Sequence, residues 1–180
     1  MSGWRARTAL VGAVAGLALV TAGCSAATPA AAPVVVATTG RPSAAAVMVC
    51  APEAQADIQE AIGVGPASPP VQSYVDSVLT CRYPYADGTM VLTVKDLPDV
   101  PAATAYLSSL RATADHPVDA QGIGQAAFTV VGGSIYVRKD AKVLTVDVTG
   151  LPATFGPRAQ PRSAIAVTVA ALIMNCWKEA

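Results

Sequence analysis

Few side chains in this sequence could carry out chemistry: a single histidine, four cysteines and scattered carboxylates. His116 stands in Asp115-His116-Pro117, and a catalytic role would need a nucleophile and an orienting acid brought beside it. The sequence contains no GxSxG, HExxH or Walker motif, so we interpret His116 as an exposed loop residue rather than a catalytic base. The sequence therefore predicts a protein that is not an enzyme.

The acidic residues do not point to a metal site or to a glycosidase pair. Several lie close together in sequence, at Asp96, Asp99, Asp115 and Asp119. Their spacing lacks the periodicity of an EF-hand, and a catalytic carboxylate pair requires a geometry that spacing alone does not establish. The cysteines are widely spaced, without a CxxC pair, so a zinc site is not expected either. We expect no metal and no cofactor, and we interpret these carboxylates as caps and solvated loop residues.

Cys24 follows a segment that has the three parts of a secretory signal. Two arginines precede an apolar stretch at 9–20, and Ala22-Gly23 stands directly before the cysteine. An apolar stretch of about 12 residues is too short for a membrane-spanning helix, which needs about 20. The pattern resembles the lipobox of bacterial lipoproteins, although Thr21 replaces the usual leucine. The resemblance implies cleavage before Cys24, acylation of its thiol (palmitate) and a lipid anchor in the cell membrane, on its extracytoplasmic face; an ordinary cleaved signal is the alternative.

This interpretation divides the chain into three segments. Residues 1–23 are the predicted lipoprotein signal peptide, and residues 24–47 are the predicted lipidated cysteine and a disordered tether rich in Ala, Pro and Thr. The run Val34-Val35-Val36 is the one part of that tether that could instead pack as a strand. Residues 48–180 are predicted to form a single α+β domain large enough to bury a core. Because no cluster of Lys or Arg provides a basic footprint, nucleic-acid binding is not expected.

The apolar periodicity predicts the element order αββαβββα in this domain. The expected helices cover residues 52–62, 101–114 and 161–177, and the expected strands cover residues 78–86, 89–96, 126–131, 134–139 and 142–149. Asp87-Gly88 between two alternating runs is a strong hairpin signal. Pro84 favours an edge position for the strand that contains it. We expect a mostly antiparallel five-stranded sheet with three helices packed on one of its faces.

With Cys24 lipidated, the domain keeps an odd set of thiols: Cys50, Cys81 and Cys176. An exported domain lies in an oxidising compartment, so a disulfide is expected. We predict Cys50–Cys81, because this pair would join the first helix to the first strand, and closing a loop of about 30 residues should stabilise the fold by about 3–4 kcal/mol. The pairs Cys81–Cys176 and Cys50–Cys176 are the alternatives. An unpaired Cys176 is expected to be a small buried hydrophobic residue of the last helix.

Two further groups of side chains could contact a ligand. Tyr83 and Tyr85 share a face of the first strand, where core packing is the usual role. A ligand groove lined by tyrosines is the alternative, which makes both of them candidate ligand-binding residues. Arg138, Lys139 and Lys142 flank a hairpin turn. We interpret them as a solvated strand edge, with contact to an anion or a lipid headgroup as the alternative.

Five short segments carry a resemblance to a known family. A cysteine precedes the first helix and a second one lies in the first strand, and a glycine-rich turn leads into a strand series. These segments read Val49-Cys50-Ala51-Pro52, Thr80-Cys81-Arg82-Tyr83, Gly122-Ile123-Gly124-Gln125-Ala126-Ala127-Phe128, Ile135-Tyr136-Val137-Arg138-Lys139 and Val143-Leu144-Thr145-Val146. The domain thereby resembles small secreted actinobacterial (mycobacterial-type) lipoproteins of a family without an established activity, in which a tryptophan is frequent at the place of Tyr83. The resemblance implies a fold and a cellular address, and no catalytic residue.

The sequence as a whole predicts a lipid-anchored lipoprotein of the cell envelope. Its partners are expected to be the membrane, through the anchor, and a protein of the envelope bound by a non-enzymatic surface domain. The alternative is a carrier that holds a lipid or a small apolar ligand in a cavity between the sheet and the helices. An enclosed cavity would favour the carrier, and an exposed apolar patch would favour the interaction domain.

Overall fold

The structure is a computed structural model, and it describes residues 40–177. The predicted signal peptide at 1–23, Cys24 and most of the predicted tether lie outside the described residues. Within them the chain forms four α-helices: α1 (Ala44–Met48), α2 (Pro52–Ile62), α3 (Val100–Thr113) and α4 (Arg162–Cys176). Residues 44–47, which the sequence assigns to the end of the tether, belong to α1. Ser43 caps α1 and joins it to the domain, since its backbone N–H and its hydroxyl both donate to Asp96.

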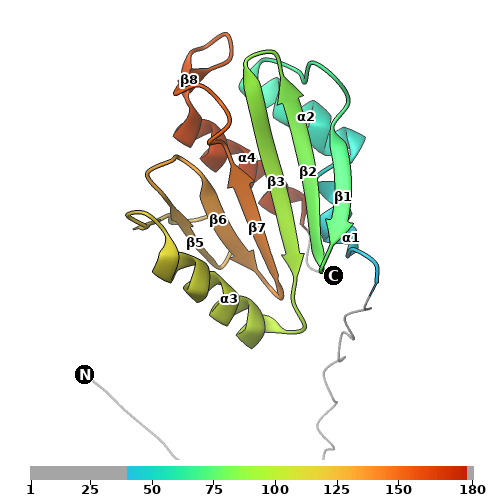
Figure 1. Cartoon of the computed structure of the whole chain (residues 1–180), viewed down its shortest axis with the longest axis vertical. Coiled ribbons are helices and arrows are strands. Elements are labelled where there is room, and N and C mark those ends of the chain that lie inside the picture. The colour runs from blue at the N-terminus through green and yellow to red at the C-terminus, as the bar shows by residue number, and fades with distance from the viewer. Residues whose placement is uncertain (1–39, 178–180) are drawn as a thin grey trace, which may run out of the picture. The chain divides into compact units, whose positions relative to one another are not determined.

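A seven-stranded sheet lies at the centre of the domain, in the order β1-β2-β3-β7-β6-β5-β4, with every neighbouring pair antiparallel (Figure 1). Its strands are β1 (Val71–Val75), β2 (Val78–Tyr85), β3 (Gly88–Asp96), β4 (Val118–Asp119), β5 (Ala126–Thr129), β6 (Ile135–Lys139) and β7 (Lys142–Asp147). A separate hairpin joins β8 (Thr154–Phe155) to β9 (Gln160–Pro161). The predicted α+β class and antiparallel sheet are confirmed, but the sheet has seven strands rather than five, and the described chain has four helices rather than three.

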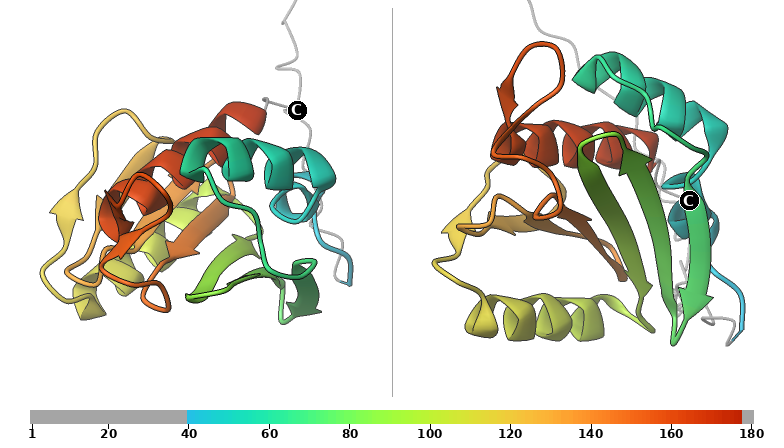
Figure 2. Two further views of the ribbon diagram at one scale, coloured as in Figure 1. Left: turned by 90° about the horizontal axis from the view of Figure 1, so that it is seen from above. Right: turned by 45° about the horizontal axis from the view of Figure 1, so that its top comes forward.

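Helices cover both faces of this sheet (Figure 2). We call the face that packs against α1, α2 and α4 the inner face, and the opposite face, which packs against α3, the outer face. The prediction that all helices share one face is wrong, because the half of the sheet formed by β5–β7 is apolar on both faces. Ala127 and Val137 join the core under α4, whereas Phe128, Tyr136 and Val143 pack in a second cluster with α3.

The inner face is closed by densely packed apolar side chains. Tyr83 and Leu92 from the sheet and Ile165 from α4 are each 0% exposed, and Ile58 from α2 is 1% exposed. The helix α4 is apolar around most of its surface, as expected for a buried core helix, and it buries Ile165, Ala166, Val169, Ala170, Ile173 and Met174. No helix within residues 40–177 combines the length and the apolar character that crossing a membrane requires.

The strand β2 lies inside the sheet, so the edge position predicted from Pro84 is wrong. β1 pairs with β2 only from Val78 to Arg82, and Pro84 lies beyond that pairing. The Pro84 carbonyl accepts a hydrogen bond from the Ala67 N–H at 2.7 Å, on the side away from β3. The N and O atoms of a strand residue point to the same side. The missing N–H of Pro84 therefore faces a side that no strand of the described chain occupies.

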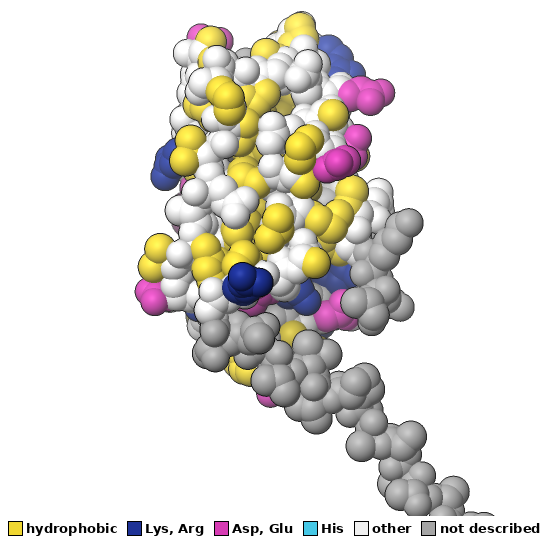
Figure 3. Space-filling view, turned by 90° about the vertical axis from the view of Figure 1, so that its right-hand side faces the viewer, with side chains coloured by type: hydrophobic (Ala, Val, Ile, Leu, Met, Phe, Trp, Pro, Cys, Tyr) yellow, Lys and Arg dark blue, Asp and Glu magenta, His cyan; other side chains and the backbone are white. Residues whose placement is uncertain are grey.

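The outer face is covered only in part. The helix α3 packs over β6 and β7, and β1–β3 remain open on this face (Figures 1 and 2). β1 also forms one edge of the sheet, and its Val71 and Val75 are 63% and 64% exposed. Figure 3 shows the side of the molecule on which β1, α1 and α2 lie, where hydrophobic side chains gather in the middle and most charged side chains stand near the margins. This side and the open half of the outer face thus include the exposed Val71 and Val75 of β1.

Candidate functional site

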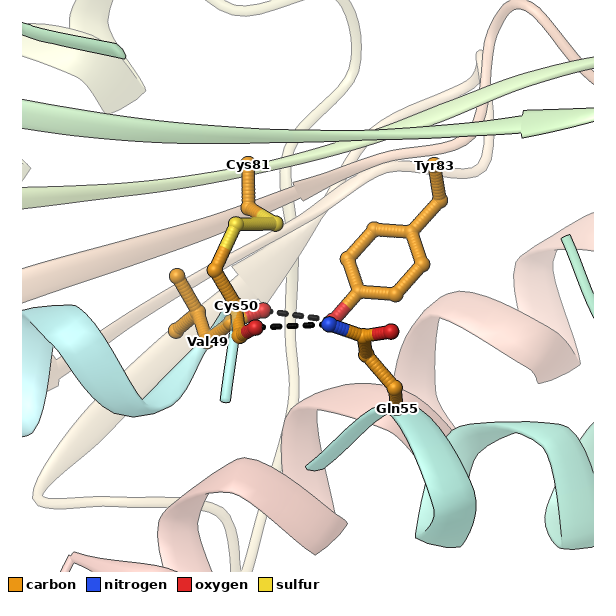
Figure 4. Close-up of a disulfide and its surroundings, with 5 residues drawn as sticks. All are labelled: Val49, Cys50, Gln55, Cys81 and Tyr83. Carbon is orange, nitrogen blue, oxygen red and sulfur yellow. Dashed lines mark hydrogen bonds between the residues drawn. A yellow bond between two sulfur atoms is a disulfide. The ribbon is translucent and has the colours of Figure 1, made fainter. Parts of the chain in front are cut away.

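The disulfide predicted first among the alternatives is present, between Cys50 and Cys81 (Figure 4). It joins the segment between α1 and α2 to the middle of β2 and closes a loop of 31 residues. A loop of this length corresponds to about 3–4 kcal/mol of stabilisation in the chain-entropy model. Cys176 is the free cysteine of the described chain and is only partly buried near the end of α4. The disulfide therefore has a structural role in fixing the helical layer onto the sheet.

Tyr83 lies beside this disulfide, and its hydroxyl is already used by the protein (Figure 4). The hydroxyl donates to the Val49 carbonyl at 2.5 Å, and Gln55 donates from Nε2 to the neighbouring Cys50 carbonyl at 2.7 Å. Burial is the main cause that raises the pKa of Tyr83 well above the ordinary range of a phenol, and the nearby Tyr85 is a smaller cause. With no exposed surface, Tyr83 holds the α1–α2 junction rather than lining an open groove.

Tyr85, the second tyrosine singled out from the sequence, also packs on the inner face. It is 6% exposed, and its ring meets the edge of Phe155 at a centroid distance of 5.0 Å. Burial raises the pKa of Tyr85 to about 12. Its hydroxyl is buried without a hydrogen-bond partner among the described residues. The structure thus brings both tyrosines into the core. They line none of the three surface pockets, which lie at α2, beside α3 and at residues 119–127.

His116 and the acidic residues of the middle of the chain are dispersed. The His116 side chain is 85% exposed and lies 3.7 Å from Asp115. Asp96 accepts the Ser43 hydrogen bonds, and Asp99 caps α3 by accepting from the Ala102 N–H at 2.7 Å. No cluster of His, Cys, Asp or Glu within the described residues could hold a metal ion. Asp115 and His116 are thus solvated, Asp99 is a helix cap and Asp96 holds Ser43, whereas Asp119 lies on β4 and pairs with Arg111, which the sequence interpretation did not foresee.

A groove of about 340 Å³ on the outer face is the more promising site. It lies between α3 and the strands β4–β6, on the half of the sheet far from β1. α3 contributes one wall, and β5 and β6 contribute the floor. The lining residues are Thr104, Leu107, Ser108, Arg111, Asp119, Ala126, Ala127, Phe128 and Arg138. Apolar side chains and two arginines thus meet in one concave site, the combination expected for binding a small molecule.

Arg138 comes from β6 and shares a row of the sheet with Ala126 and Val143. One guanidinium N–H, at Nη1, donates to Gln125 Oε1 at 2.6 Å. The Nε atom is buried and has no hydrogen-bond partner among the described residues. Arg138 is therefore not a fully solvated residue of a strand edge. The same holds for Lys139, whose Nζ donates to the Met174 and Trp177 carbonyls at the end of α4.

Arg111 reaches the groove from the last turn of α3. Its guanidinium carbon lies 5.5 Å from the centre of the Phe128 ring, and Nη1 donates to Asp119 Oδ1 at 2.6 Å. The side chains of this ion pair are 39% and 64% exposed, so the pair adds little stability. Sequence reasoning missed Arg111, because a single arginine on a helix gives no signal until the helix is known to cross β5. Arg138 was among the candidates for anion contact.

Asp147 is a carboxylate elsewhere on the outer face whose pKa the protein shifts. Burial by itself raises the pKa of Asp147, but donors outweigh it: the Thr149 N–H at 2.9 Å, the Thr149 hydroxyl at 2.7 Å and the Ser134 hydroxyl at 3.0 Å. Together with the charge of Arg162, they hold the pKa of Asp147 below its ordinary value. The carboxylate is consequently a structural anion that fastens the start of β6 to the end of β7.

Comparison with known proteins adds no assignment to this geometry. No protein-family model, no curated protein and no solved structure matches the chain. The candidate sites are therefore defined by their own residues: the closed, disulfide-bonded inner face, the open edge at β1 and the arginine-lined groove beside α3.

Proposed function

We propose that this chain is a lipid-anchored binding domain of the cell envelope, without enzymatic activity, that pairs strand β1 with an extended segment of a partner protein. Two features of the chain support the address. Cys24 ends a signal segment of the lipoprotein type. The domain also contains the disulfide Cys50–Cys81, which is typical of proteins that fold in an oxidising compartment.

The observation that carries the binding role is the unguarded edge of β1. Natural sheets protect their edges with charged residues, prolines, bulges or very short strands. β1 is five residues long, contains no charged residue and no proline, and exposes Val71 and Val75. The opposite edge, β4, is only two residues long. An exposed edge of this kind can accept a further strand through backbone hydrogen bonds, which is the mode called β-strand addition.

The surface beside this edge indicates what the partner segment should be. On the outer face, the register places Ser73, Thr80 and Thr93 side by side across β1–β3, and it places Val71 beside Arg82 and Val91. This surface is mostly small or β-branched, and its charged residues are Arg82 on β2 and Lys95 on β3. A complementary segment would alternate small or β-branched side chains, since the outer-face side chains of β1 that it would meet, Val71, Ser73 and Val75, carry no charge.

The alternative function, a carrier with a cavity between sheet and helices, has less support. The residues that would line such a cavity, including Tyr83, Leu92 and Val146 of the sheet and Ile165 of α4, are each 0% exposed and belong to one packed cluster. An apolar ligand could enter this layer only by displacing side chains that already fill it.

The anchor is tested by replacing Cys24 with Ala and following the chain in membrane and soluble fractions. The wild-type chain should fractionate with the membrane, and the Cys24→Ala chain should leave it, because two or more acyl chains are needed to hold a protein stably at a bilayer. Cys176→Ala is the matched control and should stay with the membrane. A Cys24→Ala chain that remains fully membrane-bound would refute the anchor.

The binding edge is tested by native electrophoresis of gently solubilised envelopes. We expect the wild-type chain to migrate in a complex that is lost in the double variant Val71→Lys/Val75→Lys, because lysines on an edge strand oppose pairing. Val118 and Val131 are 63% and 67% exposed, away from β1, so Val118→Lys/Val131→Lys is a control matched in exposure and charge. Loss of the complex in both variants, or in neither, would contradict the proposal.

A further inference from the structure

We propose that the groove between α3 and β4–β6 binds a small amphipathic monoanion, a carboxylate attached to a short apolar chain. This site is independent of the β1 edge and of the proposed function, since it lies at the other end of the sheet. The inference rests on the donors, the net charge and the apolar floor of the groove.

The first step is the unused donor of Arg138. Its Nε–H is buried, and no described residue accepts a hydrogen bond from it, while Nη1 is held by Gln125. Gln125 is itself fixed, because its Nε2 donates to Asp140 and its Oε1 also accepts from the Asp140 N–H. A buried polar group without a partner is rare in native proteins and is more costly when it is charged. Because the Nε atom is closed off from solvent, an acceptor atom of a ligand in this groove would satisfy it after a small movement of the Arg138 side chain.

The second step is the net charge of the groove. Its lining contains two guanidinium groups, Arg111 and Arg138, and one carboxylate, Asp119. The excess is one positive charge, which one carboxylate would neutralise and a phosphate dianion would exceed. A guanidinium group presents its donors in a planar fork that matches the two oxygens of a carboxylate. Arg111 uses one donor atom for Asp119, so its remaining N–H groups can face a ligand.

The third step is the apolar remainder of the groove. Leu107, Ala126 and Phe128 contribute carbon surface between the two arginines. The hydroxyls of Thr104 and Ser108 donate to carbonyls of their own helix, at 2.9 Å each, so they offer no donor to a second anionic group. At about 340 Å³, the groove is at the lower end of the size range of ligand pockets. One carboxylate with a short hydrocarbon chain matches this combination.

Calorimetric titration with four simple probes tests the chemistry of the site. The full chain would carry Cys24→Ala, so that no attached acyl group competes. We expect octanoate to bind, and octanol, acetate and inorganic phosphate to bind at least about tenfold more weakly, which corresponds to about 1.4 kcal/mol. Octanol binding as tightly as octanoate, phosphate binding more tightly, or no binding of octanoate would overturn the proposal.

Variants of the arginines test the location. Arg138→Gln and, separately, Arg111→Gln should each weaken octanoate binding at least about tenfold. Arg82→Gln is the matched control, because Arg82 is an exposed arginine of β2 outside the groove, and it should bind like the parent chain. Unfolding curves identify a variant that fails to fold. In that case the location is found in the parent chain instead, because octanoate should change the amide chemical shifts of β5 and β6. Unchanged affinity in both variants, or shifts confined to other strands, would place the ligand elsewhere.

Discussion

The two faces of the central sheet differ in how completely their side chains are buried and hydrogen-bonded. On the inner face, the disulfide Cys50–Cys81 and the hydrogen bond from Tyr83 to Val49 tie the helices to β2, and large apolar residues are fully buried. On the outer face, α3 covers only part of the sheet, β1 exposes valines, and the Arg138 Nε has no partner among the described residues. The inner face therefore serves mainly to hold the fold together, whereas the outer face combines structural contacts, under α3 and at Asp147, with the surfaces that are available for binding.

The largest expected effect is on the inner face, at the disulfide. The double variant Cys50→Ala/Cys81→Ala should lower the free energy of unfolding by about 3–4 kcal/mol, because the unfolded chain is no longer restrained. Denaturation by urea measures this change. Cys176→Ala should shift the free energy by less than about 1 kcal/mol, since a partly buried free thiol makes few contacts. Equal destabilisation by the two variants would show that the disulfide does not stabilise the fold more than the free thiol of Cys176 does.

Tyr83→Phe should have the next largest effect. The substitution removes the hydroxyl that donates to Val49 and leaves a buried carbonyl unsatisfied, at a cost of about 1–3 kcal/mol. Tyr106→Phe on α3 is the control, because Tyr106 is only half-buried and no hydrogen bond from its hydroxyl is found among the described residues. The same urea titration compares them. A Tyr83→Phe chain as stable as its parent would show that the hydroxyl is not needed to hold the α1–α2 junction.

The outer face should respond to pH through Asp147. Its folded pKa is lowered, so its charge stabilises the fold above the unfolded pKa, and this contribution is lost as the pH falls through the folded pKa. Asp147→Asn should therefore be less stable than the parent chain at about pH 7, and this deficit should be smaller at about pH 2.5, below the ordinary pKa of an aspartate. Asp57→Asn, at an exposed position on α2, should match the parent at both pH values. A deficit of Asp147→Asn that grows on acidification would contradict this assignment.

The smallest effect on stability is expected at the open edge. Val71→Lys/Val75→Lys should change the free energy of unfolding by only about 0.5 kcal/mol, because both side chains are mostly exposed. The same variant should nevertheless abolish the complex in the envelope. A large loss of stability would show that these valines serve the fold rather than a partner.

Most of the fold could be predicted wherever a long periodic pattern was present. The helices α2, α3 and α4, the hairpin at Asp87-Gly88 and the strands β5–β7 all follow from such patterns. β1 was missed because its signals are weak. It follows two prolines, and its turn uses Asp76 and Ser77, whose φ angles of 52° and 60° suit a type I′ turn that normally takes Asn-Gly. The strands β4, β8 and β9 span two residues each, which is too short for any periodicity.

The site was less predictable than the fold. The pairing of Cys50 with Cys81 followed from the compartment and from the need to join a helix to a strand. The placement of α3 opposite α4 did not follow, because Phe128 and Tyr136 were not recognised as a second apolar face of β5 and β6. Without that placement, nothing in the sequence could bring Arg111 near Arg138.

Cross-linking in the cell envelope tests most directly the claim that the open edge binds a partner and the helical face does not. A photoreactive amino acid would replace Ser73 on β1 in one chain and Gln59, exposed on α2, in another. We expect a discrete cross-linked product at position 73, absent at position 59 and lost when Val71→Lys/Val75→Lys is added. Equal products at both positions, or a product at 73 that survives the two lysines, would contradict the account.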